Sequence, residues 1–170
     1  VDAKSNFKNN YSHDVADLAR EISTALGLNE KTKDLIYYAA LLRNIGKITL
    51  PEELFNKKEK LSKEDWEKLQ NHPNVGVSIL MSINFLSEVV PYITYHKERW
   101  DGAGEPEGLK GMSIPLGSRI IAIADAYSAM TSDRTYRDAL SKEKALEIME
   151  SESGIKWDPA LVKVLIDLKK

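Results

Sequence analysis

Two histidines and one aspartate offer the most direct chemistry in this sequence. His72 precedes a proline, His96 lies where an apolar segment passes into a Gly-rich stretch, and Asp125 lies in the apolar run IIAIADAYSAM. An ionised carboxylate on an apolar helix face is costly to bury without a partner. Together the three side chains could form a two-histidine, one-carboxylate metal site. The alternative is structural: an aspartate paired with a local Arg or capping a loop, and two histidines with satisfied or exposed side chains.

Three cations form a second candidate group. Lys47 directly follows a glycine after a predicted helix, where a cation interacts favourably with the helix dipole. Arg134 and Arg137 lie three residues apart in TSDRTYR. They could fork around a phosphate, or pair with acidic neighbours on the surface. From the residues alone, both interpretations stay open.

The elements that must position these residues are predicted to be helices throughout. Apolar residues recur at three- and four-residue spacing. Helices are expected to begin at Asn29, at Ser62 with Asp65 as a capping-box-like pair, at Ser141 and at Asp158, and Gly residues are expected to end two of the helices. His72-Pro73 is expected to end one helix and begin the next. No useful alternation of period two competes, so we predict an all-α, single-domain helical bundle. The expected helices span 11–26, 29–46, 51–55, 62–72, 73–83, 86–96, 119–130, 142–149 and 159–170.

A Gly- and Pro-rich stretch, residues 95–120, interrupts the helices. The density of these two residue types in YHKERWDGAGEPEGLKGMSIPLGSRI excludes a continuing helix and predicts a long loop. Long loops in compact domains are usually functional or disordered. Trp100, Met112, Ile114 and Leu116 are expected to anchor this loop to the core, which favours order.

Composition sets the outer limits. A length of 170 residues suits one domain with a real core, and a net charge of -2 gives no reason to expect a nucleic-acid polymer or a membrane surface as partner. The absence of Cys excludes disulfides and fits a cytoplasmic protein. We predict one domain over 1–170, with 1–10 as a linker, excised from a longer regulator because the chain starts at Val1.

Three stretches together resemble the HD-GYP family, and the similarity runs from about residue 11 to residue 159. They are ALLRNIGKITLPEELFNKKEKLSKEDWEKLQNHPNVG, HKERWDGAGEPEGLKGMSIPLGSRI and AIADAYSAMTSDRTYRDAL. HD-GYP proteins are bacterial signalling domains, a branch of the HD phosphohydrolases, and active members hydrolyse cyclic di-GMP with bound metal ions. The resemblance implies an all-helical fold of the HD type. It also implies that Lys47, Arg134 and Arg137 match positions that contact substrate phosphates.

The sequence departs from the family at positions that bind metal. The defining His-Asp pair is Arg43-Asn44 here, the ligand of the first helix is Tyr11, and the second loop histidine is Lys97. Neither Arg nor protonated Lys donates a lone pair, and both repel a divalent ion. We therefore expect no bound metal cofactor. Two further departures are Glu105, at the tyrosine of the naming motif, and Ser128, at a second aspartate.

His72, His96 and Asp125 match ligand positions that survive. We expect Arg43 or Lys97 to occupy the vacated metal space and to neutralise Asp125. Arg43 is the better candidate, because a guanidinium is planar and weakly hydrated.

Three functions follow as expectations from the resemblance and its departures. The first is a non-catalytic signalling domain that acts through receiver, sensor or GGDEF domains, in cis or in trans. The second is a receptor that binds cyclic di-GMP or another anionic ligand without cleaving it. The third is a residual phosphodiesterase with one Mn, Fe or Mg ion on His72, His96 and Asp125. The sequence favours the first, with the second close behind.

Overall fold

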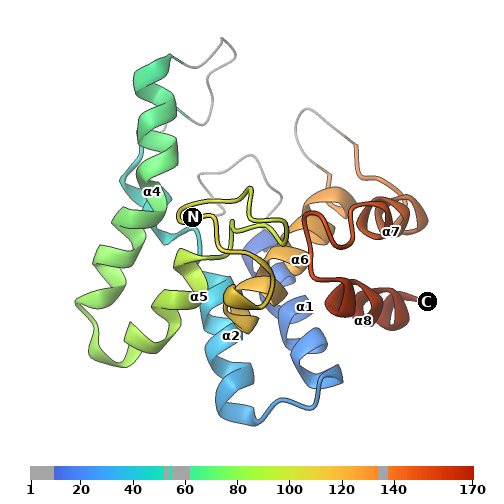
Figure 1. The fold of residues 1–170 in the computed structure, drawn as a ribbon. Helices are drawn as coiled ribbons and strands as arrows, with labels where there is room; N and C mark the ends of the chain where they lie inside the picture. Colours follow the sequence, from blue (N-terminus) through green and yellow to red (C-terminus); the bar gives the residue numbers. More distant parts are fainter. Residues whose placement is uncertain (1–9, 52–53, 55–61, 134–137) are drawn as a thin grey trace.

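The computed structural model describes residues 10–51, 54, 62–133 and 138–170, and within them the fold is helical (Figure 1). In these ranges the only pairing of β type is an isolated bridge between Ser153 and Trp157. The prediction of an all-α protein is therefore confirmed. The elements are α1 Tyr11–Ala25, α2 Glu30–Leu42, η2 Ile45–Thr49, α4 Lys63–Met81, η3 Asn84–Val89, α5 Val90–Thr94, η4 Gly111–Ser113, α6 Leu116–Thr131, α7 Lys142–Ser151 and α8 Pro159–Lys169, where η marks a 3-10 helix.

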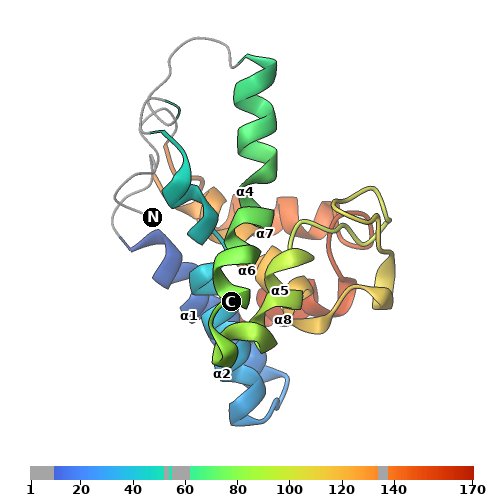
Figure 2. The same ribbon diagram turned by 90° about the vertical axis from the view of Figure 1, so that its left-hand side faces the viewer.

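The core lies where α1, α2 and α6 pack against one another. Helix α6 is the most apolar of these and carries Ile120, Ile121 and Ile123 with no exposed surface. Figure 1 draws α4 on one side of this centre and α7 and α8 on the other. Figure 2 shows that one end of α4 extends beyond the body of the molecule. Asp125 is part of α6, the helix at the centre of the fold, so side chains of the neighbouring helices determine its surroundings.

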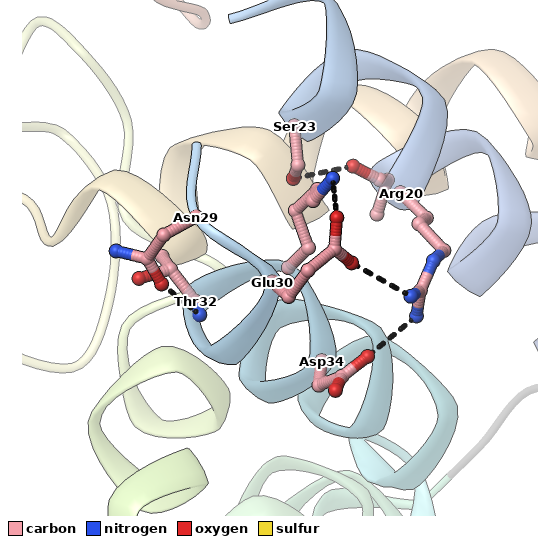
Figure 3. A network of polar contacts seen from close by, with 8 residues as sticks. Arg20, Ser23, Asn29, Glu30, Thr32 and Asp34 are labelled. Carbon is pink, nitrogen blue, oxygen red and sulfur yellow. Dashed lines mark hydrogen bonds and ion pairs between the residues drawn. The ribbon is translucent and has the colours of Figure 1, made fainter. Parts of the chain in front are cut away.

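A short turn joins α1 to α2, and polar contacts fix this hairpin (Figure 3). Asn29 caps α2, as predicted, because its Oδ1 accepts a hydrogen bond of 2.9 Å from the Thr32 amide. Arg20 of α1 pairs with Asp34 at 2.7 Å and with Glu30 at 3.5 Å. These ion pairs are exposed, so they orient the hairpin more than they stabilise it.

Other predicted helix starts are also confirmed. Ser62 and Asp65 form a reciprocal capping box at α4. Ser141 accepts a hydrogen bond from the Lys144 amide at α7, and Asp158 accepts one from an amide in the first turn of α8. Local hydrogen bonding therefore decides where these helices begin.

The predicted helix break at His72-Pro73 is wrong, because α4 continues through Pro73 as one helix. The packing of α4 against η2 gives the reason. A Cβ atom on Gly46 of η2 would lie 1.8 Å from the His72 carbonyl oxygen and 2.7 Å from the Gly76 amide nitrogen. Two backbones thus meet without intervening side chains, and this contact favours a continuous helix despite the amide that proline lacks.

Two other predicted segments differ from the structure. Helix α2 ends at Leu42 and not at Gly46, and η2 follows it. The segment predicted as one helix over 86–96 is divided between η3 and α5, with Pro91 in the first turn of α5. Most of the short helix predicted over 51–55, like the linker predicted over 1–10, lies outside the described residues.

The loop between α5 and α6, residues 95–115, is ordered and will be called the Gly-rich loop. Trp100 and Asp101 donate backbone hydrogen bonds to the carbonyls of Lys156 and Ile155, at 3.0 and 2.9 Å, in the turn before α8. Its predicted anchor Ile114 is buried, whereas Met112 is 75% exposed and does not anchor the loop to the core.

Candidate functional site

Asp125 and Arg43 form the centre of the candidate site. Three hydrogen bonds end on a single carboxylate oxygen, Oδ1 of Asp125: Nε of Arg43 at 3.0 Å, Nη2 of Arg43 at 2.6 Å, and the hydroxyl of Tyr11 at 2.9 Å. The predicted pairing of Asp125 with Arg43 is therefore confirmed. The burial is unequal, because the Arg43 side chain is 0% exposed and that of Asp125 is 36% exposed. Asp125 is thus less buried than its apolar surroundings in the sequence suggest.

Several contacts fix the position of the Arg43 guanidinium. Arg43 is the C-terminal cap of α2, and its Nη1 donates a hydrogen bond of 2.6 Å to the Ala40 carbonyl. Its Cζ lies 5.3 Å from the centre of the Tyr11 ring, in cation–π range. These contacts fix the planar guanidinium beside Asp125, where two of its nitrogens donate to one carboxylate oxygen.

The charge of Arg43 determines the protonation of Asp125. Burial by itself raises the pKa of the Asp125 carboxyl, but Arg43, His96 and the hydrogen bonds from Arg43 and Tyr11 outweigh it. The net effect lowers that pKa below its ordinary value of 3.8. Asp125 is therefore an ionised carboxylate at neutral pH, compensated by a fixed cation.

His96 lies at the start of the Gly-rich loop and is 6% exposed. Its Nδ1 lies 2.6 Å from the Ile93 carbonyl oxygen, so Nδ1 is assigned the proton and donates it. Burial lowers the pKa of His96 from 6.5 to about 4, although the Ile93 carbonyl and Asp125 act in the opposite direction. His96 is therefore a neutral imidazole near pH 7, with Nε2 as its acceptor atom.

Lys97 lies beside a small cavity of about 60 Å³. Burial lowers the pKa of Lys97, while Glu105 and Asp125 raise it. A cavity of this size is much smaller than the roughly 300–1,000 Å³ of typical ligand pockets, so it cannot enclose a dinucleotide. Its lining residues are Asn74, Val77, Thr94, His96, Lys97, Glu105 and Pro106.

The other predicted site residues are His72, Lys47, Arg134 and Arg137. His72 is buried on α4, where its backbone faces Gly46 of η2. Lys47 is half-buried in η2, and its amide donates a hydrogen bond of 2.9 Å to the carbonyl of Asn44. Arg134 and Arg137 lie outside the described residues. The structure therefore brings together Asp125, Arg43, Tyr11, His96 and Lys97.

The metal centre that the resemblance implies does not fit these side chains. Oδ1 of Asp125 already accepts two guanidinium donors and a hydroxyl, and a fixed cation at 2.6 Å repels a divalent ion. In the ranges described, no group of three or more His, Cys, Asp and Glu side chains is arranged to hold a metal ion. The donor set is that of a salt-bridged carboxylate.

Sequence analysis missed the positive role of Tyr11 and two buried acidic groups. Tyr11 was considered only as a lost metal ligand, although its position four residues before Val15 places it on the buried face of α1. Glu98 is buried in the Gly-rich loop, and its Oε1 accepts a hydrogen bond of 2.7 Å from the Glu107 amide. Asp158 was predicted only as a helix cap, but it also pairs with the distant Arg119.

Comparison with known proteins shows the family to which the chain belongs. The family model described as HD domain matches residues 1–161. The chain is 39% identical over 152 residues to 3'3'-cGAMP-specific phosphodiesterase 1 of Vibrio cholerae, covering 89% of this chain and 35% of the relative. It is 37% identical over 154 residues to the cyclic di-GMP phosphodiesterase response regulator RpfG of Xanthomonas campestris, covering 89% of this chain and 41% of that protein. The chain thus spans well under half the length of these relatives.

A solved structure shares the fold. The crystal structure of a cyclic GMP-AMP specific phosphodiesterase of Vibrio cholerae superposes with a TM-score of 0.74 at 23% identity, and covers 95% of this chain and 44% of that one. The resemblance to the HD-GYP family is therefore confirmed at the level of sequence and fold. Among the residues that the structure describes, no helix combines the length and apolar character needed to cross a bilayer.

Proposed function

This chain belongs to the HD domain family, and we propose that it is a non-catalytic signalling domain of the HD-GYP type whose metal site has become a salt bridge. The observation that carries the proposal is the contact of Arg43 with Asp125. A bound metal ion would lower the pKa of a water molecule to about 7, so that hydroxide could attack a phosphodiester. Arg43 supplies a positive charge at this carboxylate. Unlike a metal ion, a guanidinium cannot coordinate a water molecule and lower its pKa.

The signal is proposed to pass through protein contacts, with receiver, sensor or GGDEF domains as the partners. This class of partner follows from the resemblance, and the relative RpfG is named a response regulator. The extra length of the relatives leaves room for such domains in proteins of this kind. In this proposal the helical body is retained as a scaffold, while hydrolysis is lost.

Binding of cyclic di-GMP is the second candidate function. It is supported by the persistence of Lys47, Arg134 and Arg137, which are basic at positions matching phosphate contacts in the family. The cavity beside Lys97 is too small for this ligand.

The test combines metal analysis with a turnover assay. Protein purified without chelator is analysed for Mn, Fe and Mg, and then incubated with cyclic di-GMP and added Mn²⁺ or Fe²⁺. The cyclic di-GMP phosphodiesterase of Thermotoga maritima, 36% identical over 155 residues, serves as the positive control. We expect neither stoichiometric metal nor linear product. Stoichiometric metal with turnover would instead establish the residual phosphodiesterase on His72, His96 and Asp125.

Calorimetry with cyclic di-GMP decides between scaffold and receptor. If the domain is a receptor, Arg134→Ala weakens binding, whereas Lys144→Ala, which removes an exposed cation of α7, leaves it unchanged. A lack of binding by the parent chain restricts the function to protein contacts. Equal losses in both variants would indicate nonspecific attraction between charges.

A further inference from the structure

Arg119 connects the Gly-rich loop to Asp158 at the start of α8. It lies in the first turn of α6, and its Nε donates a hydrogen bond of 2.9 Å to the Ile114 carbonyl at the end of the Gly-rich loop. Its Nη1 donates to Oδ2 of Asp158 at 2.6 Å. Its Cζ lies 5.9 Å from the ring centre of Trp100, near the start of the loop. The Arg119 and Asp158 side chains are 9% and 5% exposed, so water screens this ion pair weakly.

Asp158 uses its two carboxylate oxygens for different purposes. Oδ2 pairs with Arg119, and Oδ1 accepts a hydrogen bond of 2.9 Å from the Ala160 amide, which caps α8. If α8 moves, Asp158 moves with it, and Arg119 is left as a buried cation without its partner. That outcome is costly, because removing one member of a buried ion pair leaves an uncompensated charge.

The Gly-rich loop connects the ion pair of Arg119 and Asp158 to the wall of the cavity beside Lys97. The Gly111 amide donates a hydrogen bond of 3.0 Å to the Trp100 carbonyl, which joins the two sides of the loop. Within the same loop, Oε1 of the buried Glu98 side chain accepts a hydrogen bond from the Glu107 amide. The intervening segment carries Glu105 and Pro106, which line the cavity. The cavity wall and α8 are thus joined through a continuous series of contacts.

We propose that Arg119 couples the Gly-rich loop to α8, so that the two open as a single cooperative unit while the α1–α2 hairpin stays closed. A partner that displaces α8 therefore loosens the loop wall of the cavity beside Lys97, and a ligand that closes the loop stabilises α8. This reciprocity follows because each site biases the same element. The inference holds whether or not the domain has lost its hydrolytic activity.

Hydrogen exchange of the 170-residue chain, followed by mass spectrometry in increasing subdenaturing urea, tests the coupling without a mutation. We expect peptides from the loop, which contain the hydrogen-bonded amides of Trp100, Asp101 and Gly111, to open with the same free energy and urea dependence as those of α8. The α1 and α2 peptides should open at a higher free energy. Different urea dependences for the loop and α8 in the parent protein would overturn the proposal.

Asp158→Asn tests the role of the ion pair itself. The variant keeps an oxygen that can cap α8 but removes the charge that faces Arg119. We expect exchange in both the loop and α8 to accelerate by on the order of tenfold or more. Ser141→Ala is the matched control, because it removes the cap of α7, where Ser141 accepts a hydrogen bond from the Lys144 amide. It should accelerate exchange in α7 alone.

Acceleration confined to the first turn of α8 in Asp158→Asn would show that Arg119 does not transmit the change, and would contradict the proposal. The same conclusion would follow if Ser141→Ala opened the loop equally. If Asp158→Asn does not fold, the urea dependence of the parent protein decides the question alone.

Discussion

Removal of Asp125 should destabilise this protein more than removal of its partner Arg43. In Asp125→Ala, the guanidinium of Arg43, which is 0% exposed, loses both of its bonds to the carboxylate and keeps its contacts with the Ala40 carbonyl and the Tyr11 ring among the described residues. Arg43→Met leaves a carboxylate that is 36% exposed and that keeps the hydroxyl of Tyr11 as a donor. Water already solvates part of this carboxylate, whereas the guanidinium is 0% exposed in the parent structure, so the two substitutions are not equivalent.

The magnitude follows from this difference in exposure. Breaking a fully buried ion pair by removing one member costs about 3–5 kcal/mol. Because Asp125 is partly exposed, water already screens the pair, and we expect about 2–3 kcal/mol for Asp125→Ala. We expect about 1 kcal/mol for Arg43→Met, since an apolar side chain fills the space and the carboxylate that remains is partly exposed and keeps the Tyr11 hydroxyl as a donor.

The double variant Arg43→Met with Asp125→Ala gives the sharpest comparison. It contains no orphaned cation, so it should be more stable than Asp125→Ala alone, although it carries one more substitution. Urea unfolding followed by far-ultraviolet circular dichroism gives the four free energies. For a chain of this size, 1 kcal/mol corresponds to about 2–4 °C in Tm, so melting curves provide a second measurement.

Asp34→Ala is the matched control, because it breaks the exposed pair between Arg20 and Asp34 in the α1–α2 hairpin. Their side chains are 40% and 50% exposed. We expect a loss much smaller than that of Asp125→Ala, because exposed ion pairs contribute little to stability. The reasoning fails if Asp125→Ala costs no more than Arg43→Met, or if the double variant is less stable than Asp125→Ala.

Three further predictions concern pH, packing and metal ions. Because the pKa of His96 is 6.5 ordinarily and about 4 when folded, the unfolded chain binds the extra proton between these values. Stability should therefore be full above pH 6.5 and fall by about 3 kcal/mol on acidification towards pH 4, and His96→Asn should flatten this slope in urea titrations at several pH values. The lowered pKa of Asp125 acts below its ordinary value of 3.8, outside that window. Gly46→Ala should cost more than about 3 kcal/mol, because its Cβ would lie 1.8 Å from a backbone oxygen, whereas Gly27→Ala, at a φ of 68° in open space, should cost about 1 kcal/mol by the same assay. Addition of Mn²⁺ should leave Tm unchanged, and a saturable rise in Tm would contradict the salt-bridge interpretation of the site.

Much of the fold could be predicted because its signals are local. Asn29, Ser62, Ser141 and Asp158 each cap a helix through a bond to an amide two or three residues away. These bonds join residues that lie close together in the sequence, so the helix starts were predictable. The break expected at Pro73 was wrong because the local rule for proline does not include the contact between the two backbones at Gly46.

The candidate site could be predicted only in part. Counting charges and lost ligands indicated that Asp125 needs a cation, and the chemistry of guanidinium favoured Arg43. The sequence did not indicate that Tyr11 donates to the same oxygen, or that Asp125 remains partly exposed. Hydrogen-bond direction and solvent access depend on how the helices pack, which no short window specifies.

The sequence by itself determined the all-helical class, the family, the positions of the caps and the cation, Arg43, that pairs with Asp125. Only the tertiary structure decided which further side chains meet at these charges. Tyr11 reaches Asp125 across 114 residues, and Arg119 reaches Asp158 across 39. Helix formation is governed by bonds between residues three or four apart, whereas these contacts exist because apolar packing brings distant helices to one place.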